Sequence, residues 1–292
     1  MIRFLVVLWL LWAPTARASQ EVFVVLSAGL KPYLEFAEGF QEEVHPCRLF
    51  FLPEEAEMAR HLLREPREVV AVGTRALRLV SDFEVRRLFY ALVVSPEVAQ
   101  ALCPGRQLCG LYLRLPPETT LPTVKRTLSE KLGRDRAVIL LPYSSPENRP
   151  FARQAREVGR QLGLEVKAHQ VARADELLEL IRQEDFDLLY CVPDPLYATE
   201  EIISVVLRLS LLRGKAVCGY NHFFAEKGAL ISFVFDYREV GREAGRRWVK
   251  RLCGPAPAPF QVILNKKVLD FLRQRAETQK HKNSEGLDRG RR

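Results

Sequence analysis

The feature that most constrains the fold is a regular alternation of short apolar runs with amphipathic helical stretches. The apolar runs form two series along the chain. The first series comprises Val22 to Leu26, Arg48 to Leu52, Val69 to Val72 and Tyr90 to Val94. The second comprises Ala137 to Leu141, Glu165 to His169, Asp187 to Val192, Lys215 to Gly219, Leu230 to Phe235 and Gln261 to Leu264. Such alternation is typical of parallel sheets covered by helices on both faces. The sequence therefore predicts an α/β fold with two doubly wound lobes.

Helical periodicity fills the intervals between these runs. Phe151, Ala155, Val158 and Leu162, for example, fall on one helical face. The predicted helices are 32–44, 54–64, one from Thr74, 151–162, 175–183, 200–212 and 238–252. A Pro-rich stretch, Leu115 to Thr120, interrupts the pattern and is interpreted as the first crossing between lobes.

The N-terminus has the pattern of a secretory signal peptide. Arg3 precedes an apolar run from Phe4 to Ala13, and a small-residue site ends at Ala18. The alternative, an uncleaved anchor, would need roughly 18 apolar residues, which is more than this run offers. We expect cleavage after Ala18 and a soluble, exported protein in the periplasm or another extracytoplasmic compartment.

The net charge of +8 is not evidence for nucleic-acid binding. Arg3 and Arg17 leave with the signal peptide, and the tail from Ala276 carries five basic against three acidic residues, so about +4 remains on the body. The polar tail, 276–292, is predicted to be disordered. Arg238, Arg242, Arg246 and Lys250 form a basic stripe, which is either a solvated face compensated by nearby glutamates or a docking surface.

Six cysteines in an exported chain permit disulfides. Cys103 and Cys109 flank a Pro-Gly turn and are the pair most easily closed locally, although the connectivity stays open. Cys191 and Cys218 lie in apolar runs, where buried free thiols are expected. No Cys or His cluster has the spacing of a metal site, and we expect neither metal nor cofactor.

Polar residues follow the predicted strands at the edge where ligands bind in parallel sheets. In the second half these are Tyr143, Ser144, Ser145 and Asn148, then Asp194, then Tyr220 and Asn221. The serines and Asn148 could equally be helix caps. Asp194 could pair with a ligand ammonium or cap the following helix. His222 is more simply a surface or core histidine.

In the first half, Ser27, Thr74 and Ser95 occupy the corresponding strand ends, and Gly73 allows close backbone approach. Thr74 is predicted as an N-cap. Enzymatic motifs are absent from the sequence: it contains no GxSxG, no phosphate loop and no HExxH. A triad of Ser144 or Ser145 with His222 and Asp194 lacks any local oxyanion hole. We therefore expect a binding protein, not an enzyme.

Four motifs in order resemble one family. They are the strand Asp187 to Leu196 with its Pro-Asp, then Val217 to Tyr220, then Glu226 to Leu230, then Asp236-Tyr237 with Gly241. Val72 to Thr74 and Leu108 to Gly110 add weaker matches. Together they resemble ABC-transporter substrate-binding proteins of the tryptophan- and tyrosine-binding type, which have the type I periplasmic binding protein fold.

The resemblance implies three crossings between the lobes and a ligand in the cleft between them. The predicted lobes are 19–117 with 235–255, and 118–234 with 256–275. The cleft positions implied are Thr74, Tyr143, Ser144, Asp194, Tyr220, Asn221 and Asp236. The partners implied are a small polar or aromatic solute, such as an amino acid, and a membrane permease, with the protein acting as a monomer. The alternative is a divergent ligand sensor or partner-docking module without transport.

Overall fold

The computed structural model describes residues 21–289, and its side chains through residue 278. The predicted signal peptide lies outside the described residues. The chain forms two compact units. Unit 1 comprises residues through Val93, Glu97–Gly110 and Tyr237–Pro255, and unit 2 comprises Val94–Pro96, Leu111–Asp236 and the residues from Ala256 onward. Each unit is a mainly parallel α/β lobe, which confirms the predicted fold class.

The sheet of unit 1 has the strand order β11-β5-β4-β3-β1-β2. Its strands are β1 (Val22–Leu26), β2 (Cys47–Phe51), β3 (Glu68–Val72), β4 (Arg87–Val93), β5 (Cys109–Tyr112) and β11 (Pro255–Pro257). β1 pairs in parallel with both β2 and β3, and every residue of β1 is buried. The sequence of such a strand is a continuous apolar run because helices cover both faces of the sheet.

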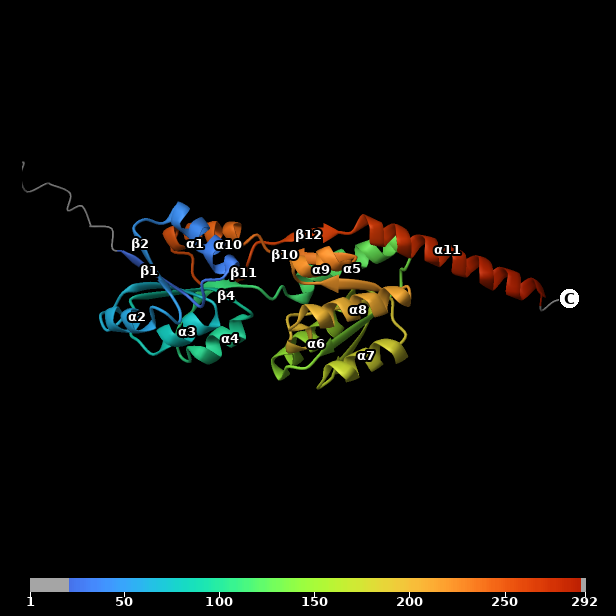
Figure 1. Cartoon of the computed structure of the whole chain (residues 1–292), viewed down its shortest axis with the longest axis horizontal. Helices are drawn as coiled ribbons and strands as arrows, with labels where there is room; N and C mark the ends of the chain where they lie inside the picture. The colour runs from blue at the N-terminus through green and yellow to red at the C-terminus, as the bar shows by residue number, and fades with distance from the viewer. Residues whose placement is uncertain (1–20, 290–292) are drawn as a thin grey trace, which may run out of the picture. The chain divides into compact units, whose positions relative to one another are not determined.

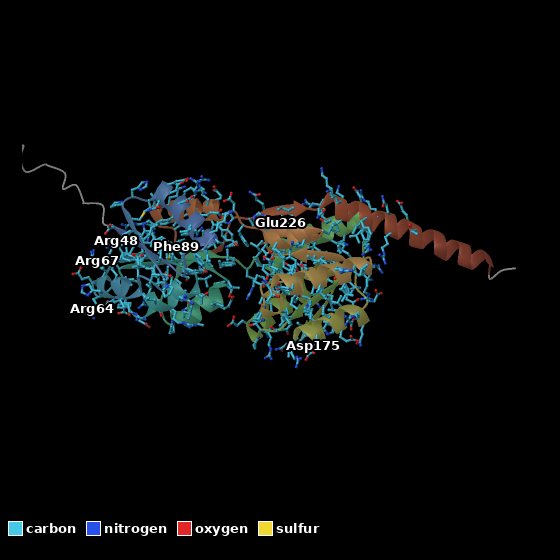
Figure 2. All side chains as sticks on the ribbon, in the orientation of Figure 1. Arg48, Arg64, Arg67, Phe89, Asp175 and Glu226 are labelled. Carbon is cyan, nitrogen blue, oxygen red and sulfur yellow. A yellow bond between two sulfur atoms is a disulfide. The ribbon has the colours of Figure 1, made fainter. Side chains whose placement is uncertain are left out.

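Helices cover the two faces of this sheet unequally. Figure 1 shows α1 (Lys31–Glu43) and α10 (Tyr237–Val249) on one face, and α2 (Ala56–Leu62), α3 (Thr74–Ser81) and α4 (Pro96–Leu102) on the other. Phe89 of β4 lies inside the unit, whereas Arg64 lies at its surface (Figure 2). The sequence did not predict α4 and β5, because both are short and follow a proline or a turn.

Helices α1 and α10 pack backbone against backbone. A Cβ at Gly39 would lie 1.9 Å from the Arg238 carbonyl oxygen, and one at Gly241 would lie 2.1 Å from that of Phe36. This approach brings the basic stripe of α10 beside Glu42 of α1, which pairs with Arg238 and Arg242 at 2.5 Å each. Arg246 pairs with Glu239, Glu43 and Glu243. The charges of the three arginines are thus compensated by glutamates of two helices, α1 and α10. The sequence had indicated only the glutamates of α10.

The sheet of unit 2 has the strand order β12-β10-β9-β8-β6-β7. Its strands are β6 (Val138–Tyr143), β7 (Glu165–Gln170), β8 (Leu188–Tyr190), β9 (Ala216–Gly219), β10 (Ile231–Val234) and β12 (Gln261–Leu264). β6 to β10 run parallel, and β12 joins β10 antiparallel. The carboxyl ends of β6, β8, β9 and β10 therefore share one edge of the sheet.

The helices of unit 2 alternate with these strands along the chain, beginning with α5 before β6. They are α5 (Pro117–Arg126), α6 (Arg149–Gln161), α7 (Ala174–Gln183), α8 (Glu200–Leu212), α9 (His222–Lys227) and α11 (Lys266–Arg289). α5 packs on α6, and α8 packs on both α7 and α9. The core between α7, α8 and the sheet is built from apolar side chains such as Leu189, Ile203 and Phe224. Asp175 and Glu226 lie at the surface of this unit (Figure 2).

The chain leaves unit 1 earlier than predicted. The first crossing falls after Gly110, and the stretch from Leu115 to Thr120, where the crossing was predicted, contains the start of α5 at Pro117. Apart from the short segment Val94–Pro96, the chain passes between the units three times. The tail prediction was also wrong, since α11 continues through residue 276 to Arg289. The segment is rich in helix-forming Lys, Gln, Glu and Arg and contains no proline, so it continues the preceding helix. Among residues 21–289, no helix combines the length and apolar character needed to cross a bilayer.

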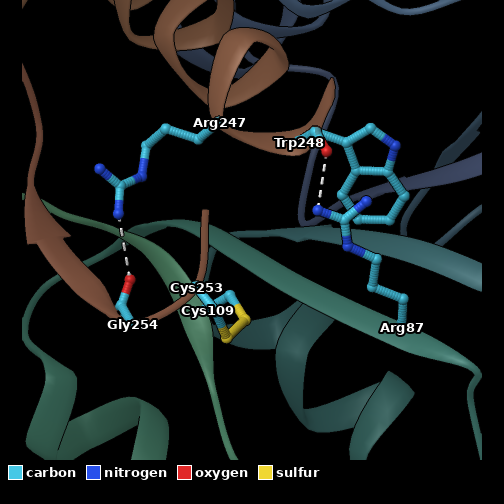
Figure 3. The surroundings of a disulfide bond; sticks show 6 residues. All are labelled: Arg87, Cys109, Arg247, Trp248, Cys253 and Gly254. Carbon is cyan, nitrogen blue, oxygen red and sulfur yellow. Dashed lines mark hydrogen bonds between the residues drawn. A yellow bond between two sulfur atoms is a disulfide. The ribbon is translucent and has the colours of Figure 1, made fainter. Parts of the chain in front are cut away.

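A disulfide joins Cys109 of β5 to Cys253, which precedes β11 (Figure 3). The sequence favoured Cys103 and Cys109 as the pair most easily closed locally, and this prediction was wrong. Cys103 is buried where α4 ends, whereas strand pairing brings Cys109 to a Cα distance of 4.6 Å from Cys253. Beside the bond, Arg247 donates to the Gly254 carbonyl, and the Arg87 guanidinium lies 3.9 Å from the Trp248 ring centre. The bond thus ties the segment after α10 to the sheet of unit 1.

We expect the double substitution Cys109→Ser and Cys253→Ser to lower the free energy of unfolding by about 2–5 kcal/mol, because the bond closes a long loop in the unfolded chain. Chemical denaturation measures this loss. Cys47→Ser is the control, since Cys47 is a free, partly exposed thiol. Non-reducing peptide mapping that links Cys103 to Cys109 would contradict the assignment.

Candidate functional site

Asp194 organises the strand-end edge of unit 2. Its carboxylate is buried, with 8% of the residue exposed. It accepts hydrogen bonds from the Ser144 amide at 3.0 and 3.1 Å, the Ser144 hydroxyl at 2.6 Å and the Ser145 amide at 3.0 Å. It also accepts from the Asn148 side-chain amide at 2.6 Å and the Leu196 amide at 3.0 Å. The carboxylate oxygens are therefore occupied by donors from the protein itself.

The sequence produces this arrangement through two neighbouring strands. β6 and β8 pair in parallel, so the turn after Tyr143 and the Pro193-Asp194-Pro195 segment emerge side by side. Burial raises the pKa of Asp194, but hydrogen bonds from Leu196, Ser144, Ser145 and Asn148 outweigh it and leave the pKa below its usual value. The group is thus ionised at neutral pH and fixes the turn between β6 and α6.

The hydrogen bonds around Asp194 decide between the roles that the sequence left open for this residue and its neighbours, namely helix capping, ligand binding and membership of a catalytic triad. Asp194 caps the short helix Pro195–Tyr197, and Ser145 caps Pro146–Asn148 by accepting from the Glu147 amide. Asn148 is fully buried and occupies the N-cap position of α6, but its side-chain oxygen accepts no capping hydrogen bond, while its side-chain nitrogen donates to Asp194 and to the Pro193 carbonyl. No histidine lies between Ser144 and Asp194, whose side chains bond directly. His222 is exposed on α9.

A recess lies at the same edge, within unit 2. We call it the unit 2 recess, and it encloses about 20 Å³, which is room for a water-sized group. Most of its wall is apolar, and five aromatic side chains contribute to it. The lining residues are Leu113, Arg114, Leu115, Thr120, Phe151, Tyr190, Cys191, Val192, Pro193, Gly219, Tyr220, Phe233 and Phe235.

Arg114 is the charged residue in this wall. It follows β5, and only 9% of its surface is exposed. Its backbone amide donates to the Val94 carbonyl at 2.7 Å, and its guanidinium Nη1 lies 3.4 Å from the Glu147 carbonyl oxygen. A buried guanidinium presents several donors in a fixed plane. The recess therefore combines apolar walls with a single positive charge.

Two further polar groups of the wall are held inside the protein. The Tyr190 hydroxyl donates to Thr120 Oγ1 at 2.8 Å, and burial raises the pKa of this phenol. Burial also raises the pKa of the Cys191 thiol to about 12, so this cysteine is protonated at neutral pH. Neither group supplies a charge or a nucleophile to the recess at neutral pH.

The remaining predicted residues of unit 2 lie at or near this edge. Tyr143 ends β6 and is buried. Tyr220 lines the recess, is partly exposed, and its ring centre lies 5.2 Å from that of Phe224. Asn221 caps α9 by accepting from the Phe224 amide at 3.1 Å. Asp236 is exposed where the chain leaves unit 2 and is not part of the recess wall.

In unit 1, the strand ends also come together, with one correction. The Ser27 hydroxyl accepts from the Ala76 amide at 2.9 Å, so Ser27 caps α3 in place of Thr74. Gly73 is the N-cap position, at φ +88°, and a Cβ there would lie 2.6 Å from Ser27 Oγ and 2.8 Å from Tyr33. Thr74 is the first helical residue and is partly exposed.

Ser95 does not belong with these residues of unit 1. It is buried in the segment Val94–Pro96, which groups with unit 2 because the Val94 carbonyl accepts from Arg114. Ser95 and Asp236 both fall within the predicted bounds of the first lobe, but both group with unit 2.

The sequence patterns did not indicate five residues of the recess wall, namely Arg114, Phe151, Tyr190, Phe233 and Phe235. Phe151 was interpreted only as part of a helix core face, and the others lie in or next to strands with apolar patterns. Had β5 been recognised as a strand, the strand-end rule would have pointed to Arg114.

Comparison with known proteins shows similarity in structure only. No protein-family model and no curated protein sequence matches the chain. A substrate-binding protein with adhesive properties from Clostridium difficile, in its ligand-free, open form, aligns with TM-score 0.66 at 15% identity, over 87% of this chain and 94% of that one. An ABC domain from Streptococcus pneumonia in complex with L-Trp aligns with TM-score 0.60 at 16% identity, over 87% and 95%. A LacI family transcriptional regulator from Bifidobacterium animalis aligns with TM-score 0.53 at 10% identity, over 84% and 96%.

These alignments, together with the mainly parallel sheet in each of the two lobes, establish the fold. The chain has the type I periplasmic binding protein fold. The resemblance inferred from the sequence motifs is confirmed at the level of fold. Solute-binding proteins and a transcriptional regulator both have the periplasmic binding protein fold, so function has to be argued from the site.

We expect Asp194→Asn to lower the free energy of unfolding by about 2–3 kcal/mol, because an amide cannot accept all the donors that face the carboxylate. The lowered pKa gives the effect a pH dependence. The stabilisation by the Asp194 carboxylate is fully present above the pKa that this group has in the unfolded chain, about 4. It is lost as the pH falls through the lower pKa that the group has in the folded protein. Denaturation of both proteins between pH 7 and pH 3 measures this. If the difference in unfolding free energy between the two proteins stayed constant or became larger on acidification, this explanation would be contradicted.

Proposed function

We propose that the protein is the extracytoplasmic solute-binding component of an ABC-type uptake system, and that it binds a small polar or aromatic solute without chemical conversion. The observation that carries this proposal is the unit 2 recess. Its apolar and aromatic wall contains one buried cation, and it opens where the parallel strands β8, β9 and β10 end. That edge is the usual ligand site of open α/β sheets.

The absence of an activated nucleophile around the recess supports binding in preference to catalysis. The Cys191 thiol and the Tyr190 phenol are held protonated by burial, and Ser144 is engaged by Asp194. The proposal includes export through the N-terminal segment, an extracytoplasmic location, a monomeric protein and a membrane permease as partner. An amino acid is one member of the proposed ligand class.

A second candidate is a ligand sensor that does not serve transport. The observation that favours it is the similarity to a LacI family transcriptional regulator, since the same fold occurs in a protein of that kind. The docking surface considered for the basic stripe has less support. Its arginines Arg238, Arg242 and Arg246 are neutralised by glutamates of α1 and α10.

We expect a ligand of the proposed class to raise the thermal unfolding temperature, because binding to the folded state at about 100 times Kd stabilises it by about 2.7 kcal/mol. A thermal-shift screen of the purified protein against amino acids, aromatic acids, sugars and polyols measures this.

Tyr220→Ala should abolish the shift, since Tyr220 forms part of the recess wall. His222→Ala is the matched control, because His222 is exposed and does not line the recess. A screen in which no compound shifts the transition would contradict the proposed function.

A further inference from the structure

Two of the three crossings between the units run side by side. The first crossing follows Gly110 of β5, and the last follows Pro255 of β11. On the unit 1 side, the Gly110 amide donates to the Gly254 carbonyl at 3.4 Å. On the unit 2 side, the Ala258 amide donates to the Tyr112 carbonyl at 2.8 Å. We call these paired segments, 109–112 and 253–258, the crossing ribbon.

Backbone pairing holds the unit 1 end of the crossing ribbon weakly. The residues at 255, 257 and 259 are prolines, which have no N–H group to donate. The hydrogen bond from Gly110 to Gly254, at 3.4 Å, is longer than the usual range of about 2.7–3.2 Å. β11 is also an edge strand, with β5 as its neighbour in the sheet. The ribbon therefore needs a second connection at this end.

The disulfide supplies that connection. Cys109 and Cys253 directly precede Gly110 and Gly254, so the bond joins the two segments one residue before their hydrogen bond (Figure 3). β5 and β11 lie at one edge of the sheet, whereas the buried strands β1, β3 and β4 form its centre. Opening the bond should therefore loosen the ribbon while the core of unit 1 stays folded.

The position of the disulfide makes it open to a reductant. Cys253 is exposed, and Cys109 is partly exposed. The Arg247 guanidinium donates to the carbonyl of Gly254, the residue after Cys253, and a nearby cation favours the departure of a thiolate. Exposed disulfides exchange with thiols more readily than buried ones do. The bond is thus placed to respond to the redox state of its surroundings.

We propose that the disulfide between Cys109 and Cys253 is a redox-sensitive clamp on two of the three crossings. In the oxidised protein the crossing ribbon is stiff, and in the reduced protein its two segments move independently. This inference does not depend on the proposed function, because it concerns the crossings and not the unit 2 recess.

A dithiol reductant supplies the two electrons of the switch. One thiolate of the reductant attacks a sulfur of the disulfide, and the other protein sulfur leaves as a thiolate. The second thiolate of the reductant then attacks the mixed disulfide and releases the first protein sulfur. The reductant becomes a disulfide, and the protons that it gives up to solvent are balanced by those that the two protein thiolates take up.

Hydrogen–deuterium exchange tests the clamp directly. The purified protein is compared in its oxidised form and after reduction by dithiothreitol under native conditions, with alkylation and mass spectrometry reporting that Cys109 and Cys253 have opened. Reduction should speed exchange of the amides in 109–112 and 253–258 about tenfold or more, because the ribbon opens once its cross-link is gone. Exchange in β1 and β3 should stay slow, since the core of unit 1 remains folded.

A second measurement follows the effect on the whole chain. Arg64 of unit 1 and Asp175 of unit 2 are both exposed at the surface (Figure 2). Dyes attached there through p-azidophenylalanine leave the cysteines unlabelled. Single-molecule energy transfer between the dyes should show a broader distribution of transfer efficiencies after reduction, because two crossings have become more mobile.

The double variant Cys109→Ser and Cys253→Ser should match the reduced protein in both measurements and no longer respond to dithiothreitol. Cys47→Ser is the control, because Cys47 is a free, partly exposed thiol that lies outside the crossing ribbon. It should respond to dithiothreitol as the unsubstituted protein does. If the double variant does not fold, the reduced and alkylated protein takes its place.

Unchanged exchange in both ribbon segments of the reduced protein would overturn the proposal, and so would an unchanged distribution of transfer efficiencies. Fast exchange throughout β1 and β3 after reduction would also overturn it, since the bond would then hold unit 1 folded and would not act on the crossings alone. A bond that resists dithiothreitol in the folded protein would overturn its redox sensitivity.

Discussion

The strand-end edge of unit 2 depends on one carboxylate. Asp194 follows β8, yet most of its hydrogen bonds come from the turn after β6, which lies about fifty residues earlier in the sequence. A buried charge is stable only if its lone pairs are satisfied, and here five different donor groups satisfy them. The interaction fixes the ends of β6 and β8 together. Asp194 is accordingly not one of the residues that form the recess wall.

The sequence predicted the positions of the helices and strands better than it predicted which of their residues lie in contact. α8 and β12 have the predicted bounds, because an N-cap residue, Thr199, and the proline-rich segment before Gln261 mark their starts locally. Short elements such as α4, β5 and α9 were missed, because so few residues carry no clear period. The pairing of Cys109 with Cys253 was not predictable, since it depends on which strands are neighbours and not on spacing along the chain.

The same distinction holds for the candidate site. The strand-end rule correctly brought Ser144, Ser145, Asn148 and Asp194 to one edge, because parallel strands end on the same side of a sheet. It did not tell which of them stabilise the protein and which face a cavity. That division is decided by side-chain direction and burial. The fold also leaves the ligand open, because binding proteins and a regulator have it in common. The chemistry of the recess wall is therefore the stronger guide to function.

The central claim is that the unit 2 recess is the ligand site. Hydrogen–deuterium exchange of the purified protein, with and without a saturating concentration of a compound that raises its thermal unfolding temperature, tests it most directly, because the method reports the site without any substitution. The account predicts slower exchange in the segments that line the recess, 113–115, 190–192 and 219–220, and no change along α1 and α10. Unchanged exchange in all three segments, with or without protection elsewhere in the chain, would contradict the account.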